Sequence, residues 1–122
     1  MEKQIEVMKQ SAELLDTVYE GLQHMQQLLK EGKFEETIPL FGDIVYAFST
    51  IENSVSELPD EILSDDSKAL TTKVRNALDH VVGSYESKEY GKVQEVLQFT
   101  LMPSYRKWME ELDEAFRSFL VS

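Results

Sequence analysis

Cysteine is absent from the 122 residues, and proline and glycine are scarce, with three and five residues respectively. Without cysteine, the chain has no disulfide framework, no thiolate nucleophile, no iron–sulfur site and no thiolate zinc site. No uninterrupted apolar run approaches the roughly 20 residues of a membrane-spanning helix, and charges interrupt the first residues. The sequence therefore predicts a soluble, unsecreted protein of the cytoplasm.

Basic residues are also few, because 12 Lys and Arg stand against 23 Asp and Glu, for a net charge of −11. Such a charge repels phosphate backbones and anionic lipid headgroups, so neither nucleic acid nor a membrane is expected as a partner. Basic or amphipathic proteins remain open as partners. With 42% hydrophobic residues, the chain is long enough to fold as a single domain over residues 1–122.

Helical periodicity dominates the first half of the chain. Residues spaced alternately by three and four form a first stripe on one helix face. This stripe comprises Ile5, Met8, Ala12, Leu15, Tyr19, Leu22, Gln26 and Leu29, widened by Val18 and Met25. Gly32 predicts the end of this helix, because glycine takes the left-handed conformation that closes one. After a tight turn, a second stripe comprises Phe34, Ile38, Phe41, Ile44, Val45, Phe48, Ile51 and Val55.

Pro39 leaves two starts open for the second helix. A start at Phe34 places the proline just past the first turn, where it should bend the helix. A start with Thr37 as N-cap places the proline where its missing N–H has no cost. The sequence does not choose between these starts.

The pattern lapses over residues 54–67, which form the one substantial connection. Ser64 or Asp66 offers an N-cap for a third helix, and Ser87 is expected to cap the start of the next one. The third stripe comprises Leu70, Val74, Ala77, Leu78, Val81 and Tyr85.

The fourth segment, from about Glu89 to Leu120, is the most aromatic. Its stripe comprises Tyr90, Val93, Leu97, Leu101, Tyr105, Trp108, Leu112, Ala115, Phe116 and Phe119. Pro103 removes one backbone hydrogen bond and clashes with the Phe99 carbonyl, so we expect one long helix with a kink or break near Pro103.

Short turns within each half make neighbouring helices antiparallel. The sequence therefore predicts an all-α, antiparallel four-helix bundle made of two helical hairpins. At an offset of 56 residues, the hairpins match Leu22 with Leu78, His24 with His80, Phe34 with Tyr90, and Leu40 with Val96. This identity does not establish a duplication.

Chemistry-bearing motifs are not evident. Di-iron bundles use Glu-x-x-His motifs, yet neither His24 nor His80 has a glutamate three residues before it. No GxSxG, P-loop or GxGxxG string is present, and the serines fall at helix caps and in the connection. We therefore predict no catalytic residue, no metal and no cofactor.

Two surfaces are candidates for binding. The acidic residues between Glu57 and Asp66 form either a docking loop for a basic partner or a weak divalent-cation site, with capping and solubility as the alternative explanation. Tyr105, Arg106 and Trp108 form the other candidate, because Tyr105 and Trp108 share a helix face and these residue types dominate interfaces. Core packing would use the same aromatic residues.

The string EGKFEETIPLF resembles the turn and second-helix start of tetratricopeptide repeats, although the 56-residue offset and Thr37 argue against a repeat array. More broadly, LLDTVYEGLQHMQQLLKEGKFEETIPLFGDIVYAFSTIE and VQEVLQFTLMPSYRKWMEELDEAF resemble a family of small, uncharacterised helical proteins of Gram-positive bacteria. That resemblance implies an all-helical, cytoplasmic protein and supplies no catalytic residue.

The function expected from these observations is a non-enzymatic protein-interaction module, a small acidic adaptor or chaperone with an unidentified protein partner. One alternative is a bundle that binds a small ligand or metal through His24, Glu20, Tyr46 or His80. The other is a self-associating structural protein, in which a homodimer buries an uncovered apolar stripe.

Overall fold

The computed structural model describes the backbone of residues 2–121 and the side chains of residues 2–120. The elements are α1 (Glu2–Lys30), α2 (Phe34–Ser56), α3 (Asp65–Glu86), α4 (Tyr90–Val96), the π-helical segment η1 (Leu97–Leu101) and α5 (Met102–Val121). Because α4, η1 and α5 join without a break, they form one long helix, and the described chain folds into four helices without strands. The predicted all-α four-helix bundle is confirmed.

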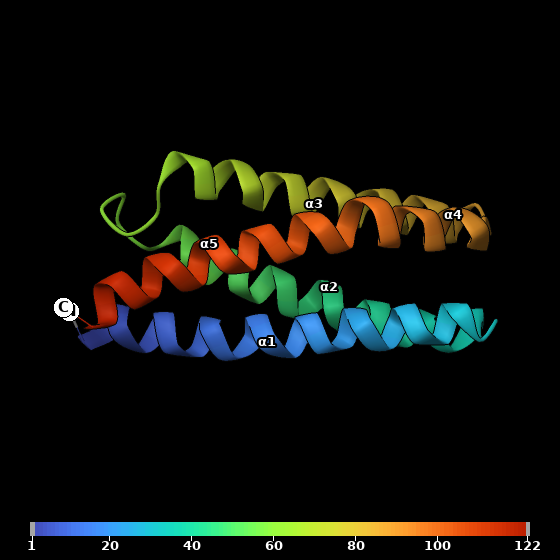
Figure 1. Cartoon of the computed structure of the whole chain (residues 1–122), viewed down its shortest axis with the longest axis horizontal. Helices are drawn as coiled ribbons and strands as arrows, with labels where there is room; N and C mark the ends of the chain where they lie inside the picture. Colours follow the sequence, from blue (N-terminus) through green and yellow to red (C-terminus); the bar gives the residue numbers. More distant parts are fainter. Residues whose placement is uncertain (1, 122) are drawn as a thin grey trace.

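The bundle consists of two antiparallel hairpins laid side by side (Figure 1). Both hairpin turns lie at one end of the molecule, and the α2–α3 connection, the start of α1 and the end of α5 lie at the other. Helix α5 packs against both α3 and α1, so the last helix joins the two hairpins.

The first turn is closed by Gly32, as the sequence predicts. Gly32 has a φ of 76°, its N–H donates to the Leu29 carbonyl, and the Lys33 N–H donates to the Leu28 carbonyl. These two bonds define a Schellman motif, in which the left-handed residue ends the helix.

The second turn repeats this motif 56 residues later, with Lys88 in place of glycine. Lys88 has a φ of 58°, and the bonds run from Lys88 to Tyr85 and from Glu89 to Ser84. Ser87 ends α3 instead of capping the next helix, and Glu89 occupies the N-cap, so the expectation for Ser87 is wrong. The residues that follow the two turns, Phe34 and Tyr90, stack with ring centroids 5.4 Å apart.

Lys88 generates a stability prediction, because a side chain in the left-handed region costs about 1–2 kcal/mol. We expect Lys88→Gly to raise the free energy of unfolding by about 1 kcal/mol in urea denaturation, after the entropic cost of glycine is subtracted. The control is Ser87→Gly, at a right-handed φ of −83°. Ser87→Gly should lower the free energy of unfolding. Equal changes in stability at both positions would contradict the left-handed conformation of Lys88.

Helix α2 begins at Phe34, which decides between the two starts that the sequence left open. Lys33 is the N-cap and makes no side-chain capping bond, so Thr37 lies inside the helix and is buried. Its hydroxyl donates to the Phe34 carbonyl. Pro39 is therefore inside α2, where it removes the backbone bond to the Glu35 carbonyl.

The α2–α3 connection is shorter than the lapse in periodicity, because α2 extends to Ser56 and α3 starts at Asp65. Ser64 is the N-cap, and its Oγ accepts the Ser67 N–H at 3.1 Å, which excludes Asp66 from that role. The apolar residues of the connection turn inward and close this end of the core. They are Leu58, Ile62 and Leu63.

Near Pro103, where the sequence predicts a kink or break, the helix contains the π-helical segment. Here the Met102 N–H donates to the Leu97 carbonyl, five residues earlier. Buried residues precede the proline at intervals of four, and each interval overshoots a full α-helical turn by about 40°. One wider turn absorbs this drift and keeps the buried stripe facing inward. The helix is not broken, in agreement with one long helix (Figure 1).

The contact between α1 and α5 combines a buried phenol with two acids. Tyr105 Oη donates to the Leu15 carbonyl at 2.6 Å, and its ring stacks on Tyr19. Burial raises the pKa of the Asp113 carboxyl above its ordinary value of 3.8, and the charge of Asp16 raises it further. Ionised Asp113 therefore destabilises this contact.

This shift predicts a pH dependence of stability. Because the folded carboxyl has the higher pKa, the folded state holds more protons, and stability falls as the pH rises from about 4 through the folded pKa. We expect Asp113→Asn to melt above the wild type at pH 7 and to match it near pH 3. Glu114→Gln, which removes one charge from an exposed neighbour, is the control. If Glu114→Gln raised the melting temperature equally, the cause would be the lower net charge and not the burial of Asp113.

Across residues 2–121, none of the helices combines the length and the apolar character that crossing a membrane would need.

Candidate functional site

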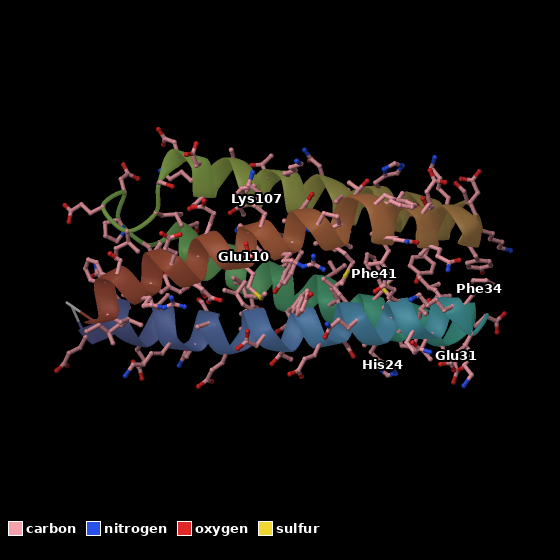
Figure 2. The ribbon with its side chains drawn as sticks, in the orientation of Figure 1. His24, Glu31, Phe34, Phe41, Lys107 and Glu110 are labelled. Carbon is pink, nitrogen blue, oxygen red and sulfur yellow. The ribbon has the colours of Figure 1, made fainter. Side chains whose placement is uncertain are left out.

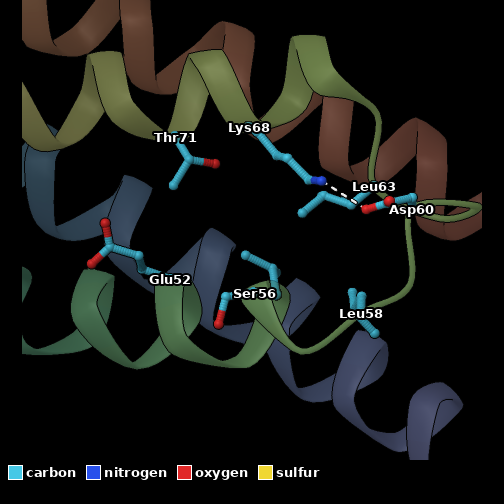
Figure 3. A pocket seen from close by; sticks show the side chains of 8 residues that line it. Glu52, Ser56, Leu58, Asp60, Leu63, Lys68 and Thr71 are labelled. Atoms are coloured by element: carbon cyan, nitrogen blue, oxygen red, sulfur yellow. Dashed lines mark hydrogen bonds and ion pairs between the residues drawn. The ribbon is translucent and has the colours of Figure 1, made fainter.

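An open cavity of about 210 Å³ lies where α2, the α2–α3 connection and the start of α3 meet (Figure 3). We call it the α2–α3 cavity. It is lined by Glu52, Val55, Ser56, Leu58, Asp60, Leu63, Lys68 and Thr71. It lies at the end of the bundle opposite the two hairpin turns.

The inner wall of the cavity is apolar. Val55 ends the buried stripe of α2, and Leu58 and Leu63 fold in from the connection, so all three belong to the hydrophobic core. The Ile62 and Leu63 N–H groups both donate to the Pro59 carbonyl, and this turn holds Leu63 beneath the opening. An apolar side chain placed here would remove these groups from water.

Across the mouth of the cavity, Lys68 and Asp60 form an ion pair with Nζ and Oδ1 2.7 Å apart (Figure 3). The Lys68 ammonium lowers the pKa of the Asp60 carboxyl, and Asp60 raises the pKa of Lys68, chiefly through this hydrogen bond. The Asp60 side chain is 88% exposed, and exposed pairs contribute little to folding stability. The pair is thus open to exchange with another charged group.

Glu52 marks the opposite side of the cavity and is held by Arg75 of α3. Arg75 Nη2 donates to Glu52 Oε1 at 2.7 Å and to Ser49 Oγ at 3.0 Å. The guanidinium also lies 4.9 Å from the ring centre of Phe48, in cation–π contact. Arg75 therefore clamps α2 to α3 beside the cavity.

Thr71 connects the cavity to the aromatic core. Its hydroxyl donates to the Ser67 carbonyl at 2.9 Å and accepts the Trp108 Nε1–H at 2.8 Å. The indole packs on Phe48, with ring centroids 5.0 Å apart, and on Tyr105, 5.4 Å apart. The Thr71 hydroxyl therefore makes its hydrogen bonds within the protein.

These contacts correct the interpretation of Tyr105, Arg106 and Trp108 as a partner surface. Tyr105 is 1% exposed and Trp108 is 0% exposed, and burial raises the pKa of the Tyr105 phenol far above its usual range. Only Arg106 is on the surface. The shared face of Tyr105 and Trp108 points into the bundle, because large apolar rings gain most by leaving water there.

The bond between Trp108 and Thr71 generates a stability prediction. Thr71→Val keeps the side-chain shape but removes the acceptor, and an unsatisfied buried donor costs about 1–3 kcal/mol. We expect that loss in chemical denaturation followed by the emission of Trp108, the single tryptophan. Thr72→Val, at the exposed neighbouring position, should change stability by less than about 0.5 kcal/mol. A Thr71→Val protein as stable as the control would refute the bond.

Of the four residues of the alternative ligand site, only Glu20 and His24 lie at the same hollow. Glu20 and His24 line a hollow of about 360 Å³ between α1 and α2, and the His24 side chain points away from the bundle (Figure 2). Tyr46 is exposed on α2, and His80 is exposed on α3. Within residues 2–121, no group of three or more His, Asp or Glu side chains is arranged to hold a metal ion.

The α2–α3 cavity presents an apolar surface beside charged groups. It combines an apolar wall, a pair of opposite charges and a carboxylate already bound to arginine. Sequence reasoning singled out the acidic residues of the connection but missed the cavity beneath them. The available signal was the placement of Leu58, Ile62 and Leu63 among those acids, which predicts inward-turned residues.

The fold is that of a small bundle of two helical hairpins, with a partly apolar cavity at the end opposite the hairpin turns. A family model described as a domain of unknown function (DUF8042) matches residues 6–111, and the chain belongs to that family. This confirms the resemblance to an uncharacterised family. Comparisons with curated proteins and with solved structures give no match.

Proposed function

We propose that this protein is a non-enzymatic interaction module, a small acidic adaptor or chaperone, that binds a basic segment of a protein partner at the α2–α3 cavity. The observation that carries the proposal is an apolar cavity whose surrounding connection is acidic. Neither feature alone specifies a partner, but together they select a segment that presents an apolar side chain next to a basic one.

The volume of the cavity determines which apolar side chain of the partner fits. A cavity of about 210 Å³ exceeds the ~150 Å³ that accommodates a benzene ring in another protein. One leucine, isoleucine or phenylalanine of the partner would therefore fill it. Burying such a side chain contributes about 1.5–3 kcal/mol, which makes it the anchor of the contact.

The acidic residues of the α2–α3 connection determine the charge that the partner segment must carry. Residues 57–66 contain five acids and no base, and the nearest base along the chain, Lys68, is already paired. An arginine or lysine of the partner can take over Asp60, since the existing pair is exposed and contributes little. The net charge of −11 also attracts a basic segment and speeds its approach.

The same observations favour binding over catalysis. The described hydroxyl groups near the cavity are bonded within the protein, as in the bonds of Ser56 to the Asn53 carbonyl and of Thr71 to the Ser67 carbonyl. The charge disfavours nucleic acid and anionic membranes as partners. We also propose that the protein is cytoplasmic and comes from a Gram-positive bacterium.

Labelled peptides test the proposal. We would compare peptides that place leucine or phenylalanine among lysines and arginines with versions carrying alanine at the apolar position or glutamate at the basic positions. Fluorescence anisotropy should show binding of the basic, apolar peptides alone, with affinity that falls as salt is added. Ser56→Phe fills the cavity and should weaken binding about tenfold or more, because the anchor is excluded.

Ser87→Phe is the matched control, because it places the same ring on an exposed serine at the other end of the bundle. It should bind the peptides as the wild type does. The proposal is wrong if no basic peptide binds at low salt, or if the two phenylalanine variants lose affinity equally. Melting temperatures of both variants establish that each remains folded.

A further inference from the structure

A second open hollow lies next to the α2–α3 cavity, between the start of α1 and the α2–α3 connection. We call it the α1 hollow. Its volume is about 390 Å³, and it is lined by Lys3, Gln4, Val7, Glu57 and Leu58. Leu58 also lines the α2–α3 cavity, so one side chain is a wall of both spaces. In Figure 3, Leu58 lies beside the start of α1, which is drawn in blue.

Leu58 is a fixed partition between the two spaces. It is 6% exposed and belongs to the hydrophobic core. Its N–H donates to the Val55 carbonyl at 3.1 Å, which continues the last turn of α2 into the connection. A ligand that occupies both spaces therefore passes over one side chain that is held in place.

The walls of the α1 hollow suit an apolar side chain. Val7 packs against the hydrophobic core, and Leu58 faces it from the connection. Lys3 and Gln4 add the aliphatic parts of their side chains. The charges of Lys3 and Glu57 are opposite, so the side chains that line this hollow carry no net charge.

We propose that the partner segment crosses Leu58 and places a second apolar side chain in the α1 hollow. This inference rests on the proposed function and specifies its partner further, as a basic segment with two apolar anchors. The exposed acids Glu57, Asp60 and Glu61 lie before and after Leu58 on the same connection. They attract a basic segment and repel a second copy of this chain, whose net charge is −11.

The geometry of the two spaces restricts the sequence of that segment. Both anchors must face the protein from the same side of the partner chain. Side chains two residues apart share a face of an extended strand, and those three or four residues apart share a face of a helix. Neighbouring side chains do not share a face, so two adjacent apolar residues cannot fill both spaces.

Peptides with one or two anchors test the inference. All carry the same lysines and arginines, and the second leucine is placed one, two, three or four residues after the first. In fluorescence anisotropy, one of the three wider spacings should bind about tenfold or more tightly than the one-anchor peptide. The adjacent pair should bind within about twofold of it. The gain should be the same at low and high salt, because the α1 hollow adds no net charge.

Substitutions locate the second anchor. Gln4→Phe fills the α1 hollow, so it should abolish the gain while the one-anchor peptide binds as before. Ser56→Phe, which fills the α2–α3 cavity, should weaken the binding of both peptides. Gln23→Phe places the same ring on an exposed glutamine in the second half of α1 and should preserve the gain. Melting temperatures establish that each variant is folded.

The outcomes separate this inference from the proposed function. If the one-anchor peptide binds and no second leucine improves its affinity, the two-anchor segment is wrong and the proposed function stands. If the gain persists in Gln4→Phe, or if Gln23→Phe removes it equally, the second anchor does not lie in the α1 hollow. If no basic peptide binds at low salt, the proposed function is wrong, and the inference fails with it.

Discussion

The aromatic pair Tyr105 and Trp108 holds the two hairpins together. Tyr105 is bonded to the backbone of α1, while Trp108 packs on Phe48 of α2 and donates to Thr71 of α3. One helix thus makes specific contacts with each of the other three. The wider turn before Pro103 serves this purpose, because without it the preceding buried residues and this pair would face different directions. The α2–α3 cavity depends on the same pair, since Thr71 forms both the cavity wall and the tryptophan's acceptor.

Most of the fold is predictable because helical periodicity and turn residues act locally. The stripes and the end of the first helix near Gly32 follow from spacing and from backbone preferences. The sequence also limits the cap of the third helix to Ser64 or Asp66, and the Ser64–Ser67 bond decides between them. The second turn is not predictable in this way, because Lys88 holds a left-handed conformation that its identity does not favour, and the sequence therefore points wrongly to Ser87 as a cap. The four-residue spacings of Val93, Leu97, Leu101 and Tyr105 carry the signal for a π-helical turn. Over three such intervals, the buried residues of a regular α-helix would rotate progressively away from the core.

The candidate site was less predictable for a physical reason. A cavity is defined by residues that are distant in sequence, and no local pattern shows that Val55 and Thr71 face the same space. The acidic connection was visible, but the inward turn of its apolar residues depends on the helices that they cover. The aromatic residues predicted for partner contact also show that a local pattern does not determine which residues pack together. Periodicity places Tyr105 and Trp108 on one face, and only packing shows that this face is the core.

The placement of the turns has a consequence for chain topology. The α2–α3 connection lies at the same end of the bundle as the start of α1 and the end of α5, while both hairpin turns lie at the other end (Figure 1). The helices are therefore arranged nearly as a closed ring that is open at one junction. A circular permutant that joins α5 to α1 and opens the α2–α3 connection should retain both hairpins and their packing, because chain order is not itself part of the contact. Such a permutant would keep the helix packing and lose the α2–α3 cavity, because the opened connection supplies part of its wall.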